Sequence, residues 1–123
     1  MPHTDKVAII EHTIPQANEN PIFGLWTWYS VENRLLLSEN FSQMAGLAKD
    51  SDYNFRTFLE IIHGNDLLHF LSEIDNMLNG AGPHWIRFQI VRPDGTGQIV
   101  KCFIESMTTA FGDVFDIVGI CFK

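Results

Sequence analysis

His63 and Asp66, near the middle of the sequence, carry the side chains of an acid–base pair. They stand three positions apart, where a run with the apolar spacing of a helix begins. A histidine at such a boundary, with a carboxylate in the first turn, also satisfies free backbone N–H groups and favours the helix dipole. We therefore predict that His63 and Asp66 cap a helix, and we assign no catalytic residue.

The two cysteines, Cys102 and Cys121, are the other candidates for chemistry. They form no C-x-x-C pair, and no histidine stands near either at the spacing of metal ligands. The chain also lacks a phosphate-binding glycine loop and the turn that presents a serine nucleophile. We expect two buried thiols, no metal site and no enzymatic activity.

The composition of the chain indicates its class of protein and argues against nucleic-acid and membrane binding. Hydrophobic residues make up 46% of the 123 residues and charged residues 19%, which predicts one folded globular domain. The 8 basic residues are scattered through a chain of net charge −7, which argues against nucleic-acid binding. Because no apolar run could cross a bilayer and the first residues lack a secretory pattern, we expect a cytoplasmic protein without direct membrane contact.

Turn residues and periodicity predict two strands, three helices and three strands, an α+β fold. The expected strands are 24–29, 34–38, 84–92, 98–109 and 114–122, and the expected helices follow Ser38, cover 55–62 and cover Asp66–Leu78. We expect residues 1–20 to form a separate unit, an N-terminal cap helix and linker, before a domain at 21–123. Alternation in the third strand places Ile86, Phe88 and Ile90 inward and Arg87 outward.

A two-residue turn at 112–113 would set the register of the last two strands, with Phe103 opposite Phe122 and Ile104 opposite Cys121. Cys102 and Cys121 are then diagonal neighbours, poorly placed for a disulfide. The same register gathers an apolar set on the outer face of the sheet: Phe103, Met107, Val118, Ile120 and Phe122. We expect the N-terminal cap helix, a second subunit in a homodimer, or both to cover this face.

Several motifs in order resemble the PAS family, in the subgroup found in bacterial sensor proteins. They are the Gly-x-Trp-x-Trp strand at 24–28, Met44-Ala45-Gly46, the His-x-x-Asp start of the long helix at 63–66, the Asp94-Gly95 turn and the final hairpin around 112–120. The resemblance implies a five-stranded antiparallel sheet with short helices and one long helix on one face. It also implies a module excised from a larger signalling protein of histidine kinase or diguanylate cyclase type, because the family's usual tail would follow Lys123.

The resemblance further implies a sensory function: binding a small ligand, mediating dimerisation, or both. The candidate pocket between sheet and helices is lined by Trp28, Phe41, Met44, Phe58, Leu71, Phe88, Ile104 and Ser106. We expect no cofactor. A flavin-binding, redox-sensing domain is the alternative, since Trp26, Trp28 and their aromatic neighbours could stack on a flavin.

Three further alternatives are disfavoured. Haem-binding relatives carry the histidine that binds the iron at a position that aligns with Leu71, so haem binding is disfavoured. Light-sensing relatives need a reactive cysteine in the helical region, whereas both cysteines here lie in the last strands, so light sensing by that chemistry is disfavoured too. A small cone-shaped enzyme of the ketosteroid isomerase kind would place its helices before its strands, whereas here the Trp26 strand precedes every long helix.

Overall fold

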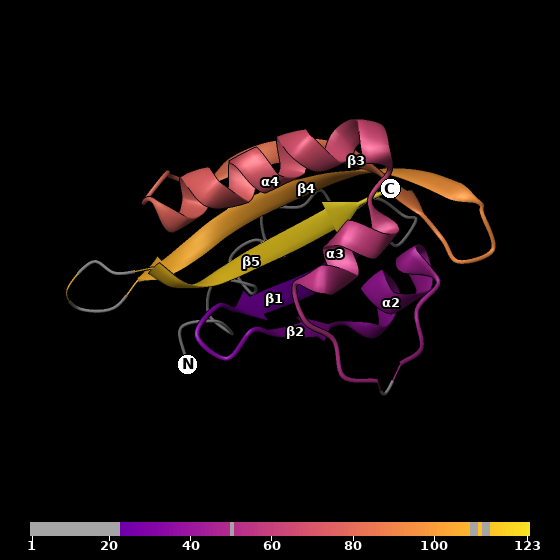
Figure 1. The fold of residues 1–123 in the computed structure, drawn as a ribbon, viewed down its shortest axis with the longest axis horizontal. Coiled ribbons are helices and arrows are strands. Elements are labelled where there is room, and N and C mark those ends of the chain that lie inside the picture. Colours follow the sequence, from indigo (N-terminus) through magenta and orange to yellow (C-terminus); the bar gives the residue numbers. More distant parts are fainter. Residues whose placement is uncertain (1–22, 50, 109–110, 112–113) are drawn as a thin grey trace, which may run out of the picture.

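The computed structural model describes residues 23–49, 51–108, 111 and 114–123. The strands are β1 (Phe23–Tyr29), β2 (Arg34–Leu37), β3 (His84–Val91), β4 (Gly97–Thr108) and β5 (Val114–Phe122), and the helices are α2 (Glu39–Ala45), α3 (Arg56–Ile61) and α4 (Gly64–Leu78). The strands form one antiparallel sheet in the order β2-β1-β5-β4-β3, and the helices lie on one of its faces (Figure 1). The predicted α+β fold is confirmed, and the predicted cap helix and linker at 1–20 lie outside the described residues.

Helix α2 begins and ends where the sequence predicts. The Ser38 hydroxyl accepts a hydrogen bond from the backbone N–H of Phe41 at 3.2 Å and a second from that of Leu25 at 2.9 Å. Gly46 ends the helix in the left-handed conformation, at φ 67°, which glycine adopts without steric cost. Because Leu25 belongs to β1, the single hydroxyl of Ser38 fastens α2 to the sheet.

Helix α4 begins two residues earlier than predicted, and His63 is its N-cap, with Nδ1 accepting from the N–H of Asn65 at 3.0 Å. Asp66 lies in the first turn as expected, but its carboxylate accepts a hydrogen bond from the N–H of Gln89 in β3 at 2.8 Å. The carbonyl of Gln89 accepts from the N–H of His63 at 2.9 Å. Asp66 therefore ties α4 to the edge strand, where we had expected it to cap its own helix.

Alternation divides the side chains of the sheet into two faces. Ile86, Phe88 and Ile90 are buried under the helices and Arg87 is exposed, as predicted. The helix-side core continues through buried residues of the other strands: Trp26, Leu35, Val100, Cys102, Ile104, Ile117 and Cys121. The opposite parity defines the outer face of the sheet, which carries Phe103, Met107, Val118, Ile120 and Phe122.

The predicted pairing of β4 with β5 is wrong by two residues. Phe103 lies opposite Ile120, Ile104 opposite Gly119 and Cys102 opposite Cys121, with an irregularity between Met107 and Thr108. A shift of two keeps every side chain on its expected face but changes each cross-strand partner. Thr108 pairs with Val114, so the described pairing does not fit a two-residue turn at 112–113.

The corrected register also overturns the expectation of two free thiols. Cys102 and Cys121 face each other directly, their Cα atoms are 4.0 Å apart, and the two residues form a disulfide. Directly opposed residues of an antiparallel pair approach more closely than the diagonal neighbours that we had assumed. The disulfide therefore follows from the register.

Candidate functional site

The predicted pocket residues surround the interior between sheet and helices. Five of the eight belong to one continuous core and are at most 2% exposed: Phe41, Met44, Phe58, Phe88 and Ile104. Trp28, Leu71 and Ser106 are half-buried at its margin. The structure thus brings most of the set together, but as side chains packed against one another.

A chain of aromatic rings runs through this interior. Trp26 packs edge-on against Phe58 with ring centroids 4.8 Å apart, Phe58 lies 4.9 Å from Phe70, and Phe70 lies 5.2 Å from Phe88. Edge-to-face and tilted contacts at these distances are the favourable arrangement of aromatic pairs. Phe70, on the predicted apolar stripe of the long helix, was missing from the predicted pocket, although that stripe was the signal that could have identified it.

Trp28 takes a structural role at the end of this chain. Its ring packs on Phe55, with centroids 4.6 Å apart, and its Nε1 donates to Oδ1 of Asn33 at 3.1 Å. The same oxygen accepts the N–H of Phe55, also at 3.1 Å. Asn33 adopts a left-handed backbone, φ 50°, which its short polar side chain tolerates better than most residues. One carboxamide thus joins the β1–β2 turn to the start of α3.

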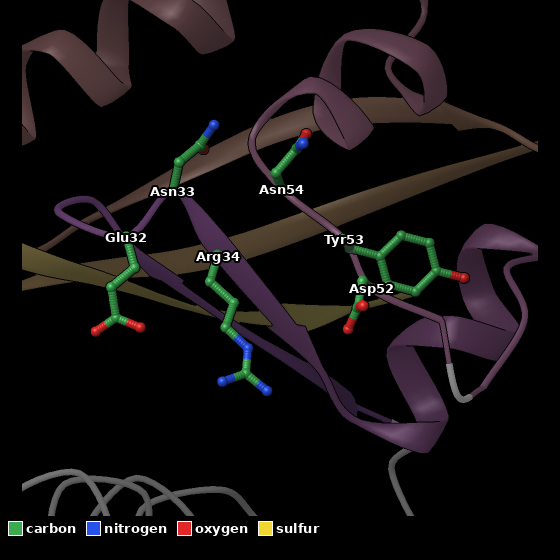
Figure 2. Close-up of a pocket in the computed structure, with 6 residues that line it drawn as sticks. All are labelled: Glu32, Asn33, Arg34, Asp52, Tyr53 and Asn54. Atoms are coloured by element: carbon green, nitrogen blue, oxygen red, sulfur yellow. The ribbon is translucent and has the colours of Figure 1, made fainter.

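A polar hollow of about 430 Å³ opens beside that turn, lined by Glu32, Asn33, Arg34, Asp52, Tyr53 and Asn54. Figure 2 shows Glu32, Arg34 and Asp52 directed to one side of β2, and Asn33 and Asn54 to the other. The Tyr53 hydroxyl donates to the carbonyl of Ala48 at 2.6 Å. Because Asn33 and Tyr53 already bind other parts of the chain, we assign this hollow to the structure of the turn.

A second hollow, of about 450 Å³, lies at the other end of the sheet and is lined by Trp85, Ile86, Arg87 and Lys101. Trp85 is 58% exposed and stands directly opposite Phe103, with ring centroids 5.3 Å apart. Neither hollow is lined by any of the eight predicted pocket residues. This one instead adjoins the outer face of the sheet.

An ion pair joins the start of β3 to helix α4, where His84 contacts Glu73. His84 Nδ1 lies 2.9 Å from the carbonyl of Gly82, and Nε2 faces the Glu73 carboxylate. The hydrogen bond to the Gly82 carbonyl has the largest effect on the pKa of His84 and raises it. Burial opposes this effect, and the hydrogen bond and the charge of Glu73 add to it, so that the pKa is raised on balance. Because both ring nitrogens face acceptors, only the protonated ring can donate to both.

The described part of the chain holds neither a metal-binding cluster nor a membrane-spanning helix. No group of three or more histidine, cysteine or acidic side chains there could hold a metal ion. Among the helices that the structure describes, none has the length and apolar character needed to cross a membrane.

Comparison with solved structures finds PAS domains of signalling proteins. The N-terminal domain of a diguanylate cyclase with a PAS/PAC sensor from Marinobacter aquaeolei is 13% identical, with a TM-score of 0.73 over 82% of this chain and 94% of that one. A sensory box histidine kinase/response regulator from Burkholderia thailandensis is 18% identical, with a TM-score of 0.65 over 82% and 76%. A light-oxygen-voltage domain studied with a flavin analogue is 13% identical, with a TM-score of 0.64 over 95% and 82%.

No curated protein sequence matches the chain significantly. The family model described as PAS fold, however, matches residues 34–121, which include β2 to β4, all three described helices and β5 except its last residue. The match covers the long helix with its histidine N-cap and the Asp94-Gly95 turn, in which Asp94 accepts from the N–H of Thr96 at 2.9 Å. The chain therefore belongs to the PAS family of sensory domains.

Proposed function

We propose that this domain is a sensory module of a larger signalling protein and that it communicates through the outer face of its sheet. PAS domains are in general sensory modules without enzymatic activity, and two of the similar structures come from a diguanylate cyclase and a histidine kinase. An effector of one of these two types is the partner that we propose.

The observation that carries the proposal is an apolar row across the outer face. Trp85 of β3 lies opposite Phe103 of β4, Phe103 lies opposite Ile120 of β5, and Ile120 lies opposite Leu25 of β1. Phe122 packs beside this row, 5.8 Å from the Trp85 ring between centroids. Ile120 is already buried within the chain and Trp85 is 58% exposed, so the surface that we propose for a partner is the exposed end of this row.

We propose that a second copy of the chain binds this row, together with the segment 1–20. Light scattering after size-exclusion chromatography tests this directly, with Trp85→Asp as the disrupting variant. Leu68→Asp is the matched control, because Leu68 is 80% exposed on α4, away from the sheet face. We expect dimers for the chain and for the control, and monomers for Trp85→Asp.

Removing residues 1–20 provides the second arm of the test. If that segment shares in covering the row, the shortened chain should aggregate, because the apolar face then lacks part of its cover. A shortened chain that remains a soluble monomer would contradict our account of the outer face.

The predicted pocket supports a second part of the proposal, in which a small apolar or amphipathic ligand enters between the sheet and the helices. It would have to displace rings of the aromatic chain, such as Phe58 and Phe88, which are at most 2% exposed. Such a ligand could bias the domain between two packed states. An absorbance spectrum of the purified protein, with mass spectrometry of the denatured supernatant, distinguishes a flavin, another small molecule and a domain filled by its own side chains.

A further inference from the structure

We propose that the Cys102–Cys121 disulfide is a redox-sensitive element, and that its reduction moves the Trp26 ring and alters the packing of the helices. The inference rests on the proposed sensory function, for which it names one input, the redox state of a thiol pair. It depends on where the two sulfurs lie in the sheet and on what contacts them.

The disulfide lies inside the helix-side core. It joins β4 to β5, the middle strand of the sheet, and both cysteines are fully buried. The Trp26 indole Nε1 donates to Sγ of Cys121 at 3.3 Å. The sulfur pair is therefore in direct contact with the aromatic chain that fills the interior.

The glycine beside Cys121 explains how the ring reaches the sulfur. Gly119 lies opposite Trp26 in the β1–β5 ladder, and a side chain there would overlap the indole ring. Because Gly119 has none, the Trp26 ring extends across β5 and rests beside Cys121. The Gly119 backbone therefore lies against one side of the ring, the Cys121 sulfur lies beside Nε1, and Phe58 and Phe70 of the helices pack on the ring.

The reaction requires a dithiol reductant, either a small molecule or a protein. Its thiolate attacks one sulfur, the bond between Cys102 and Cys121 breaks, and the released sulfur takes a proton. The second thiol of the reductant then attacks the mixed disulfide, which leaves two cysteine thiols and an oxidised, disulfide-bonded reductant. Two electrons and two protons are transferred to the protein.

Reduction changes the space that the sulfurs require. Two sulfurs that are no longer bonded must separate to van der Waals distance, and close-packed interiors accommodate such changes only by moving neighbours. Trp26 is the neighbour at Cys121, and its ring in turn packs against Phe58 of α3, 4.8 Å away, and Phe70 of α4, 6.5 Å away. The redox state at the centre of the sheet thus reaches two helices through one ring.

Because the disulfide is buried, its rate of reduction also depends on how often the helices open away from the sheet. A thiolate cannot attack a sulfur that has no exposed surface until the helix layer opens locally. Anything that holds the helices closed, including a bound ligand, should therefore slow reduction. By linkage, if reduction makes the packing of the helices on the sheet less stable, then stabilising that packing must make the disulfide harder to reduce.

The test uses the full chain, with the three tryptophan indole N–H groups followed by two-dimensional NMR. Dithiothreitol is the reductant, and alkylation followed by mass spectrometry counts the thiols. We expect no free thiol in the oxidised protein and two after reduction, a melting temperature lower by roughly 10 °C, and a shift of the Trp26 signal with that of Trp85, on the outer face, unchanged. Trp26→Phe assigns the signal.

Cys102→Ala is the matched variant, because it abolishes the bond but keeps the Cys121 sulfur beside Trp26. Its Trp26 signal should resemble that of the reduced protein and should not respond to dithiothreitol. If alkylation proves full reduction while the Trp26 signal stays at its oxidised position, the bond is a structural crosslink only and the inference is overturned. Two free thiols in protein purified without reductant would overturn it as well.

The outcomes also separate this inference from the proposed function. The oligomeric state is measured on the oxidised chain and its outer-face variants, and none of these measurements involves the thiols. A dimer whose Trp26 is insensitive to reduction removes only the redox inference. If Trp26 responds to reduction but the chain is a monomer without any ligand, only the proposed interaction surface and ligand pocket are refuted.

Discussion

The ring of Trp26 occupies the space that a side chain at Gly119 would require. The two residues are direct partners in the β1–β5 ladder, and a methyl group built on Gly119 would overlap indole atoms Cε2, Cζ2 and Nε1. The indole is only 1% exposed, so it has little free space into which to retreat. This contact fixes the position of the largest side chain in the core and with it the register of the central strands.

Gly119→Ala should therefore destabilise the domain. The added methyl group must displace either the Trp26 ring or the backbone of β5, and overpacking of this kind costs about 1–3 kcal/mol or more. Urea unfolding followed by circular dichroism measures the loss. Gly64→Ala is the matched control, because nothing lies within 4 Å of a side chain built at this position in the first turn of α4. Equal stability of the two variants would refute the packing argument.

Local signals in the sequence predicted the elements well. Ser38 and Gly46 mark the two ends of α2 because a cap and a left-handed glycine act within a few residues of the chain. Alternation likewise predicted which side chains of β3 face the helices. These features depend on neighbours in sequence, so one sequence suffices to infer them.

The register of β4 and β5 and the disulfide were not predictable in the same way. The turn signal at 112–113 suggested a short connection, whereas the observed register places Gly119 of β5 opposite Ile104 of β4. On its other side Gly119 pairs with Trp26 of β1, a residue far away in the sequence. For a similar reason, the sequence did not show that the predicted pocket is filled by its own side chains. Periodicity shows which side chains face inward, such as Phe58 and Phe88, but only the packed structure shows that they contact the same ring, Phe70.

Ser38→Ala should lower stability by about 1–2 kcal/mol, at the upper end for a helix cap. The hydroxyl accepts from two backbone N–H groups, those of Phe41 in α2 and Leu25 in β1, and both lose their partner. Ser72→Ala, on the exposed surface of α4, should change stability by less than about 0.5 kcal/mol. Urea unfolding compares the two, and a Ser38→Ala variant as stable as Ser72→Ala would show that water replaces the hydroxyl.

Asp66→Ala tests the link between α4 and the edge strand. Its removal leaves the N–H of Gln89 without its acceptor at 2.8 Å, which should cost about 1–3 kcal/mol. Hydrogen exchange gives the specific measurement, because the Gln89 amide should lose protection while amides of α2 keep theirs. Asp75→Ala is the control, since Asp75 is exposed on the same helix. Unchanged exchange at Gln89 would rule out the proposed tie.

His84 should make the stability of the domain depend on pH. Its pKa is raised in the folded protein, first by the hydrogen bond to the Gly82 carbonyl and then by Glu73, above the ordinary histidine value of about 6.5. The folded state therefore holds a proton that the unfolded chain has already released in the range between the two values. The resulting stabilisation is complete below about pH 6.5 and is lost as the pH rises through the folded pKa.

Melting temperatures of the chain and of His84→Gln, measured between about pH 5.5 and 8.5, test this sign. The advantage of the unmodified chain should be largest at the acidic end and should shrink as the pH rises, because glutamine does not titrate. His69→Gln, at an exposed position of α4, should parallel the unmodified chain throughout. An advantage that grows with pH would mean that the neutral ring is the stabilising form, contrary to the two acceptors that face it.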